Sequence, residues 1–333
     1  MTTITLLPDP SSPLDGATAE AAFADILDGK VEAEVIAPFL VTMAERDETS
    51  IEIAAAARAL RARMIRAAAP ANAIDVCGTG GDGAHSLNIS TAVALVVAAC
   101  GVPVAKHGNR AASSKAGAAD TLEALGLDLD RAAETAEESL ADLGIAFFFA
   151  QKYHPALGRL ATVRKAIGRR TILNLLGPLC NPAGVRRQLI GVARVDYLET
   201  MAEALELLGS DAAMVVAGEE NLDELSIAGP SRAVTLSANG LASSKVTPED
   251  AGLPDHPLDA IRGGDAAYNA AALRRLLEGE LGPYRDAVLL NAAAALKVAG
   301  EVYGLRDGAE EAAEAIDKGL AKALLDCWID FSR

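Results

Sequence analysis

The first scarcity in this 333-residue sequence is cysteine. The four cysteines, Cys77, Cys100, Cys180 and Cys327, are far apart and show neither C-x-x-C spacing nor histidines at metal-binding distances. This pattern argues against a zinc site and a disulfide framework, and we expect all four to be small, buried, reduced residues. Cys77 borders a glycine-rich loop, where a catalytic thiol would be well placed, but its position at the end of an apolar run favours packing.

Long hydrophobic runs are also missing. No apolar stretch approaches the roughly 20 residues that a helix needs to cross a bilayer. Asp9 and Asp15 lie near the N-terminus, where a signal peptide would have a basic and then an apolar segment. We therefore expect a cytoplasmic protein that does not associate with membranes.

Positive charge is the third shortage, because 30 Lys and Arg residues stand against 46 Asp and Glu, for a net charge of -16. Proteins that bind nucleic acid usually need a basic face, so the balance argues against a nucleic-acid partner. It does not exclude a small anionic substrate, since salt screens remote surface acids beyond about 8 Å. In a cleft, the local charges of Lys106, Arg110 and Lys115 would decide binding.

The sequence does contain enough apolar material for a large core, with 51% hydrophobic residues. Residues 1–70 have helical periodicity, and Thr49 is placed to cap an alanine-rich helix that runs to Pro70. From Ile74 onward, predicted strands and helices alternate. We predict a small all-helical domain at residues 1–70 and a large α/β domain at residues 71–333, with a mainly parallel central sheet covered by helices.

A glycine-rich loop separates a predicted strand at residues 73–76 from a predicted helix at residues 90–100, and a second strand is predicted at 102–105. The loop glycines are Gly78, Gly80, Gly81 and Gly83. Glycine adopts backbone conformations closed to other residues, so N-H groups can converge on an anion there. The N-terminus of the following helix adds a positive dipole.

The same loop fits the G-x-G-x-x-G dinucleotide motif, so a nicotinamide enzyme is an alternative. That motif expects the helix to open within the glycines and an acidic residue about 20 positions later to bind a ribose. Here polar residues intervene at positions 88–91, and the second strand leads into basic residues. An enzyme that binds NADP stays as an alternative, because basic residues after the second strand would suit its extra phosphate. An ATP-type P-loop is excluded, because no Gly-Lys-Ser/Thr follows the glycines.

A basic segment, KHGNR, follows the second predicted strand. It supplies Lys106, His107, Asn109 and Arg110. Each would singly be a common surface residue, but together with the loop glycines and the hydroxyls of Ser113 and Ser114 they favour an anion site. Ser113 and Ser114 are also placed to cap the next helix, which ends near Gly126. His107 lies between cations that depress its proton affinity, so we do not assign it as a general base.

An acidic segment at residues 219–224 follows another predicted strand, residues 212–216. Mg²⁺ that accompanies a polyphosphate takes one or two carboxylates, which Asp223 and Glu224 could supply. The alternative is a solvated acidic loop. Position favours the metal site, because the carboxyl ends of parallel strands line the ligand crevice.

Arg164 lies in the segment ATVRKAIGRRTILNLLGPLCNPAG, where Pro178 and Pro182 fix a turn and Gly177 permits close approach. A guanidinium at this point could hold a substrate carboxylate through two hydrogen bonds. Taken alone, the segment favours the alternative of a surface arginine among other basic residues.

In their order along nearly the whole chain, these segments resemble the anthranilate phosphoribosyltransferase family. The matching motifs are GTGGDG at 78–83, NIST at 88–91, KHGNR to SS at 106–114, NLLGPL at 174–179, DELS at 223–226 and LLNAAAAL at 289–296. The first motif alone would also fit the related pyrimidine nucleoside phosphorylases, against which the acidic pair and NLLGPL speak. Relatives of this fold that bind nucleic acid are a second alternative, against which the charge balance and the intact KHGNR and DELS motifs speak.

The resemblance implies transfer of the phosphoribosyl group of 5-phosphoribosyl 1-diphosphate (PRPP) to the amine of anthranilate, with release of diphosphate, in tryptophan biosynthesis. It implies a homodimer formed largely through the small domains, and substrates that meet between the domains. It also implies that helical residues near 155–185 pack with the small domain. Association with an anthranilate synthase component stays open.

The resemblance also implies three groups of site residues. PRPP would contact Gly78, Gly81, Asp82, Ser86, Asn88, Ile89, Ser90, Thr91, Lys106, His107, Gly108, Asn109, Arg110, Ala111, Ala112, Ser113 and Ser114. Anthranilate would contact Gly78, Asn109 and Arg164, and Mg²⁺ would contact Ser90, Asp223 and Glu224. Ala118 stands where the family often has a serine near the phosphates, so it is left out. No general base is assigned, since an oxocarbenium-like transition state needs a neutralised leaving group and a positioned amine.

Overall fold

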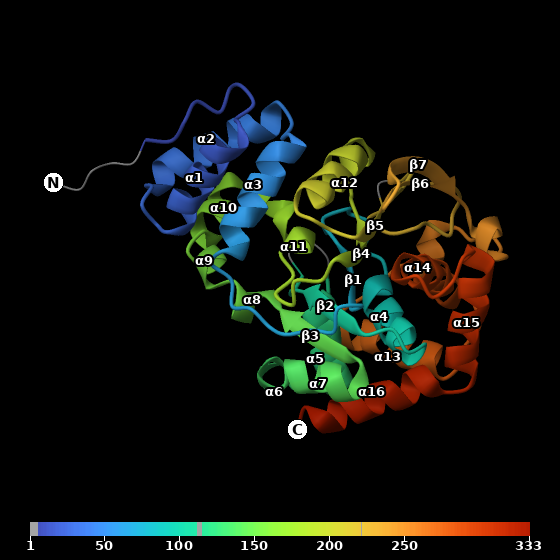
Figure 1. Ribbon diagram of the computed structural model, residues 1–333. Helices are drawn as coiled ribbons and strands as arrows, with labels where there is room; N and C mark the ends of the chain where they lie inside the picture. The colour runs from blue at the N-terminus through green and yellow to red at the C-terminus, as the bar shows by residue number, and fades with distance from the viewer. Residues whose placement is uncertain (1–5, 112–114, 221) are drawn as a thin grey trace.

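The computed structural model describes residues 6–111, 115–220 and 222–333. A small helical unit at the N-terminus lies beside a larger α/β unit (Figure 1). The small unit contains α1 (Gly16–Leu27), α2 (Ala33–Glu45) and α3 (Ser50–Arg61). The predicted fold class is confirmed.

Helix α3 begins where the sequence predicts. The Thr49 hydroxyl accepts a hydrogen bond from Glu52 N at 3.3 Å, and the Glu52 carboxylate accepts one from Thr49 N at 2.9 Å, which together form a capping box. The helix ends at Arg61, so the prediction that it runs to Pro70 is wrong. Beyond its end the backbone pairs with the large unit instead, since Ile65 N donates to Tyr153 O at 2.9 Å.

A seven-stranded sheet forms the centre of the large unit, in the order β3-β2-β1-β4-β5-β6-β7. Its strands are β1 (Ile74–Gly78), β2 (Val104–Gly108), β3 (Ile145–Phe149), β4 (Arg187–Gly191), β5 (Ala212–Gly218), β6 (Ser231–Ser237) and β7 (Gly240–Val246). Strands β1 to β5 are parallel, and β6 and β7 run antiparallel. The carboxyl ends of β1, β2, β4 and β5 therefore lie at one edge of the sheet.

Helices cover both faces of this sheet (Figure 1). The helices that follow β1 in the chain are α4 (Ile89–Ala99), α5 (Ala118–Leu125), α6 (Leu129–Glu134), α7 (Ala136–Leu143), α8 (Ala150–Tyr153), α9 (Pro155–Gly158), α10 (Ala161–Ile167), α11 (Leu176–Leu179), α12 (Leu198–Leu207), α13 (Ala266–Leu277), α14 (Pro283–Ala299), α15 (Leu305–Asp317) and α16 (Leu320–Phe331). Short 3-10 helices are η1 (Ile172–Asn174), η2 (Val195–Tyr197), η3 (Pro248–Ala251) and η4 (Leu258–Ile261). Within the described ranges, no helix has both the length and the apolar character to cross a membrane.

Alternate residues of β5 pack into two different hydrophobic cores, as the pleat of a sheet requires. Met214 of β5 packs in the core beneath α4 and α14, whereas Val215 packs in the other. This second core is continuous with the small unit, because it also contains Phe23 of α1, Leu60 of α3 and Val163 of α10. Helices from the middle of the chain thus pack on the small unit and on the sheet at once.

The cysteines are all free, and they differ in exposure. Cys77 and Cys180 are buried, Cys100 is half-buried and Cys327 is exposed. The prediction that all four are buried is therefore wrong for Cys327, which lies on the outer side of the C-terminal helix α16. Burial raises the pKa of the Cys77 thiol well above its usual range, so this residue is unsuited to act as a nucleophile.

Candidate functional site

The glycine-rich loop connects the end of β1 to the start of α4, at the carboxyl edge of the sheet. Gly80, Gly81 and Gly83 have φ angles of 70°, 73° and 78°, which confirms that the loop uses conformations favoured by glycine. Gly78 is required for a different reason. A Cβ atom there would lie 2.2 Å from Asp223 Oδ2, so only glycine leaves room for the acidic segment.

The acidic segment crosses the ends of two neighbouring strands. Gly80 N donates a hydrogen bond to Asp223 Oδ2 at 2.7 Å. A Cβ atom on Gly191, at the end of β4, would lie 1.5 Å from Asp223 O. From α14, the Asn291 amide accepts from Leu225 N and donates to Leu225 O, both at 2.9 Å. These contacts contradict the solvated-loop alternative for Asp223 and Glu224, and Glu224 is only 8% exposed.

The carboxyl groups of Asp82, Asp223 and Glu224 lie near one another at this edge, and the nearby positive charge does not balance them. Burial, followed by the negative charge of Asp82, raises the pKa of Asp223 above its usual range. Burial and then Asp223 raise the pKa of Glu224, while Lys106 acts to lower it. A hard divalent cation would relieve this repulsion, so the donor set fits Mg²⁺.

The donor set is small for a metal site. Residues 6–111, 115–220 and 222–333 contain no group of three or more His, Cys, Asp or Glu side chains arranged to hold a metal ion. Mg²⁺ commonly takes one or two carboxylates and fills its other positions with water and phosphate oxygens. Asp223, Glu224 and the Ser90 hydroxyl are the residues that would hold it here.

Lys106 lies beneath the loop, within β2 and not after it as predicted. It is 2% exposed, and its Nζ donates to Val76 O at 2.7 Å and to Ser90 Oγ at 3.2 Å. Burial lowers the Lys106 pKa, against which the charge of Asp75 acts. The buried ammonium group therefore lies between β1 and the start of α4.

His107 also lies within β2, and its side chain points to the opposite face of the sheet from Lys106. Its Nδ1 lies 2.9 Å from Gly177 O, and its Nε2 lies 3.2 Å from His154 Nε2. A carbonyl only accepts, so the His107 Nδ1 carries the proton and its Nε2 accepts from His154. Burial, more than its neighbouring cations, lowers the pKa of His107 to about 3, so both rings are neutral and His107 is not a general base.

Arg110 turns away from the glycine-rich loop. Its guanidinium makes ion pairs with Asp120 at 2.9 Å and Glu123 at 2.8 Å in α5, and it lies over the Phe149 ring. Ala111 N donates to Asp120 Oδ2 at 2.9 Å. These contacts occupy the Arg110 guanidinium and the Ala111 N-H, although the resemblance assigns both residues to PRPP. Gly108 ends β2 at the site edge, and Asn109 follows it.

The start of α5 differs from the prediction. The helix begins at Ala118 with Gly117 at its cap, so the prediction that Ser113 and Ser114 cap it is wrong. A Cβ on Gly117 would lie 2.4 Å from Ala111 N, which shows how tightly the basic segment folds back on the helix. Ser113, Ser114 and Ala112 lie outside the described residues.

The polar residues before α4 have mixed roles. The Asn88 side chain accepts from Thr121 Oγ1 at 2.6 Å and from Asn269 Nδ2 at 2.8 Å, so it joins α4 to α5 and α13. Ile89 is buried and Ser86 forms a β-bridge with Arg262. The Thr91 hydroxyl is buried and has no hydrogen-bond partner in the described part of the chain.

Arg164 lies half-buried on α10, in the helical segment that packs on the small unit, and burial lowers its pKa. The described residues offer its guanidinium no hydrogen bond or ion pair, so the group is available to a ligand. No hydrogen bond in this part of the chain joins Arg164 to Asn109 or Gly78, the other two residues assigned to anthranilate.

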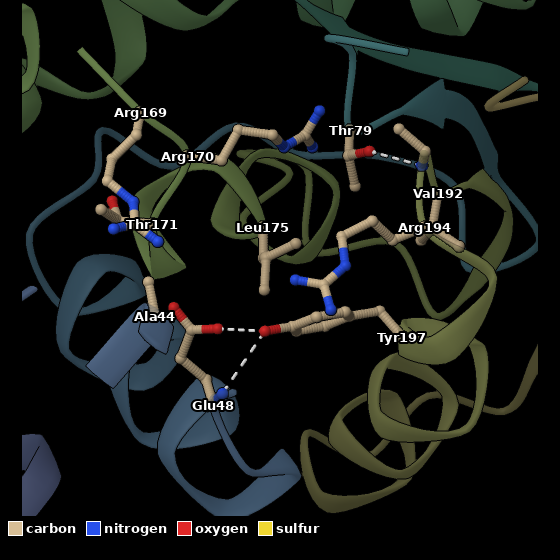
Figure 2. Close-up of a pocket in the computed structure, with 11 residues that line it drawn as sticks. Ala44, Glu48, Thr79, Arg169, Arg170, Thr171, Leu175, Val192, Arg194 and Tyr197 are labelled. Atoms are coloured by element: carbon tan, nitrogen blue, oxygen red, sulfur yellow. Dashed lines mark hydrogen bonds between the residues drawn. The ribbon is translucent and has the colours of Figure 1, made fainter. Parts of the chain in front are cut away.

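A cavity of about 210 Å³ opens between the small and large units (Figure 2). It is lined by Ala44, Glu48, Thr79, Arg169, Arg170, Thr171, Leu175, Val192, Ala193, Arg194 and Tyr197. It touches the glycine-rich loop at Thr79, and its lining does not include Arg164 or Asn109. The resemblance places the substrates between the domains, but sequence reasoning did not identify the residues that line this cavity, nor the roles of Asp75, Gly191 and Arg170.

The buried support of the site was also missed. Asp75 in β1 is fully buried, and it accepts hydrogen bonds from His107 N at 3.0 Å and from Asn181 Nδ2 at 2.8 Å. Asn181 also donates to Ala105 O at 2.7 Å. An aspartate inside an apolar strand is the signal that could have revealed this network, which ties β1 and β2 to the turn after α11.

Two family models match this chain. The model described as the glycosyl transferase family a/b domain matches residues 70–322, and the one described as the helical bundle domain matches residues 10–64. An anthranilate phosphoribosyltransferase of Novosphingobium aromaticivorans is 68% identical over 326 residues, which are 98% of this chain and 99% of the relative.

Solved structures are similar over the same extent. The crystal structure of anthranilate phosphoribosyltransferase from Thermus thermophilus has a TM-score of 0.92 and 44% identity, and covers 97% of each chain. The Saccharomyces cerevisiae enzyme in complex with PRPP and Mg has a TM-score of 0.87 and 27% identity, with 96% of this chain and 93% of that chain covered. Another structure of the yeast enzyme is in complex with 4-fluoroanthranilate.

Proposed function

Since the chain belongs to the anthranilate phosphoribosyltransferase family, we propose that it transfers the 5-phosphoribosyl group of PRPP to the amine of anthranilate. The products are N-(5-phosphoribosyl)anthranilate and diphosphate, in tryptophan biosynthesis. The observation that carries the proposal is the meeting of the glycine-rich loop, Lys106 and the Asp223-Glu224 pair at one sheet edge. The 68% identity to a named relative speaks against the phosphorylase and nucleic-acid alternatives.

The large unit supplies the donor site. The N-H groups of Gly81 and Gly83, which have no partner among the described residues, and the start of α4 would receive the diphosphate, and Lys106 adds a buried positive charge nearby. Asp223, Glu224 and Ser90 would hold Mg²⁺. When bound, the ion supplies positive charge that neutralises the leaving diphosphate. This arrangement stabilises charge without a proton acceptor, which fits an oxocarbenium-like transition state.

The helical segment supplies the acceptor site. The Arg164 guanidinium has no partner among the described residues, and it can bind the carboxylate of anthranilate through two hydrogen bonds. Asn109 and Gly78 lie at the ends of β2 and β1, toward the donor side. Anthranilate held between them would present its amine to C1 of the ribose, so that positioning provides much of the rate.

The state of the protein in the cell completes the proposal. We expect a cytoplasmic homodimer formed largely through the small units, with association to an anthranilate synthase component left as an outcome to test. Light scattering on the purified protein gives the mass of the assembly. A monomer that is fully active would overturn the dimer without touching the reaction.

The reaction itself is tested by mixing the protein with Mg²⁺, PRPP and anthranilate and following the loss of anthranilate fluorescence. Loss that depends on all three components is the expected result. Folded protein that consumes no anthranilate, but cleaves a pyrimidine nucleoside with phosphate, would replace the proposal with the phosphorylase alternative.

A further inference from the structure

Arg170 connects two parts of the molecule that are distant in the sequence. It lies between α10 and η1, in the stretch that returns from the small unit toward the sheet. Its guanidinium donates a hydrogen bond to the carbonyl oxygen of Gly80, in the middle of the glycine-rich loop. Figure 2 shows its side chain extending along the cavity wall toward Thr79.

Gly80 is held on both of its polar groups. Its N-H donates to Asp223 Oδ2 at 2.7 Å, and its carbonyl accepts from Arg170. Its φ of 70° gives this residue a conformation that few other residues would adopt. Two side chains, one from the acidic segment and one from the stretch after α10, therefore fix one glycine.

The geometry of a peptide group makes this contact matter for the next residue. The C=O of Gly80 and the N-H of Gly81 belong to one planar trans peptide, so they point in opposite directions. Drawing the Gly80 carbonyl toward Arg170 turns the Gly81 N-H away from the cavity wall. Gly81 is one of the residues assigned to PRPP, so the direction of its N-H affects how an anion is received.

The neighbouring Arg169 provides a comparison within the same stretch of chain. Both arginines line the cavity, but Arg169 makes an exposed ion pair with Glu45 at 2.9 Å. Arg170 is half-buried and has no carboxylate within ion-pair distance among the described residues, while the charges of Asp223 and Asp82 lie nearby. Its strongest described contact is thus the loop carbonyl.

We infer that Arg170 is a positioning residue for the donor site: it fixes the Gly80-Gly81 peptide and links the loop to the helical segment that packs on the small unit. The inference rests on the proposed function for its effect on PRPP. It assigns Arg170 to binding of the donor, PRPP, although Arg164, six residues earlier in the chain, is assigned to the acceptor.

The kinetic test compares Arg170→Met, Arg170→Lys and Lys165→Met. We expect Arg170→Met to raise the KM for PRPP about tenfold, as for a lost hydrogen bond from a charged donor, and to change the KM for anthranilate less than about twofold. Arg170→Lys keeps one charged donor, so its KM for PRPP should rise less than that of Arg170→Met. Lys165→Met, which removes an exposed cation of α10 outside the cavity lining, should match the unchanged protein. Equal changes in both KM values would overturn the assignment to the donor site.

Amide hydrogen exchange of the loop, measured without substrates or Mg²⁺, tests the contact independently of activity. We expect peptides that cover residues 79–87 to exchange at least about threefold faster in Arg170→Met than in Arg169→Met, since removal of a restraint frees local opening. Unchanged exchange in a folded Arg170→Met protein refutes the inference. If Arg170→Met does not fold, Arg170→Lys takes its place in the same comparison. If the unchanged protein lacks the proposed activity, the exchange measurement still tests the contact between Arg170 and Gly80.

Discussion

The parts of the molecule that carry the proposed donor and acceptor sites, called here the sheet wall and the helical wall, are built in different ways. On the sheet wall, the acidic segment, the glycine-rich loop and Lys106 are fixed by contacts at strand ends, such as the 2.7 Å bond from Gly80 N to Asp223. On the helical wall, Arg164 projects without a described partner from a helix that packs on the small unit. The comparison teaches that the sheet preforms the donor site, whereas the acceptor site depends on how the helical segment sits against it.

The largest expected effect comes from disturbing the sheet wall at Gly191. A Cβ in Gly191→Ala would lie 1.5 Å from Asp223 O, so the acidic segment must move. Overpacking of this kind costs roughly 1–3 kcal/mol of stability, and a misplacement of about 1 Å can cost about 100-fold in rate. Urea unfolding and kcat/KM measure the two losses.

Gly158→Ala is the matched control for this substitution, because a Cβ at that position meets nothing within 4 Å. It should leave activity unchanged. Full activity in Gly191→Ala would show that the acidic segment tolerates displacement, and that the donor site is less preformed than its contacts imply.

The second prediction concerns the carboxylates of the sheet wall. Asp223→Asn and Glu224→Gln each remove one negative charge from a cation site, so each should raise the Mg²⁺ concentration for half-maximal rate by about tenfold or more, which is roughly 1.4 kcal/mol. Glu219→Gln, an exposed acid in the same loop, is the control. A metal titration that is unchanged in both variants would remove the pair from the metal site.

The parts of this wall that could be predicted are those that depend on local pattern. Apolar runs followed by glycines or charged residues mark strand ends, and parallel pairing brings such ends together. The boundary of β2 was misplaced because Lys106 and His107 are polar yet buried, and their partners, Val76 O and Gly177 O, come from elsewhere in the chain. Gly191 and Arg170 were missed for the same reason. Only the fold places Asp223 against Gly191, and only the fold places Gly80 against Arg170.

The third prediction concerns the buried pair of histidines, His107 in β2 and His154 after α8. Burial lowers their pKa values to about 3 and about 4, whereas an unfolded histidine takes up a proton near pH 6.5. The unfolded chain therefore binds more protons as the pH falls below 6.5, and stability is lost toward pH 4. By pH 5 the loss is about 2 kcal/mol for each ring.

Urea unfolding at pH 7 and pH 5 measures this loss. In His154→Gln the loss between pH 7 and pH 5 should be about 2 kcal/mol smaller than in the unchanged protein, because one ring is removed. The raised pKa values of Asp223 and Glu224 act in the opposite direction in both proteins, so they cancel in this comparison. The exposed His85→Gln should not change the loss. The same pH dependence in all three proteins would show that the buried pair takes up protons in the folded state.

The fourth prediction tests the helical wall. Arg164→Ala should raise the KM for anthranilate about tenfold and leave the KM for PRPP within about twofold, because a charged hydrogen bond to the acceptor carboxylate is lost. Lys165→Ala removes an exposed cation next to it on α10 and serves as the control. Similar rises in both KM values would place Arg164 outside the acceptor site and leave the helical wall with a structural role.

The smallest effect is expected where the sheet wall meets solvent, at Arg110. Its guanidinium is taken up by Asp120 and Glu123, so the KM for PRPP in Arg110→Ala should change less than about threefold, in contrast to Lys106→Ala in the same motif. Since the ion pairs are partly exposed, raising the salt concentration should make the KM values for PRPP of the variant and of the unchanged protein more similar. A loss as large as that of Lys106→Ala would mean that Arg110 leaves its acidic partners to bind PRPP, and that this end of the donor site forms only when the substrate arrives.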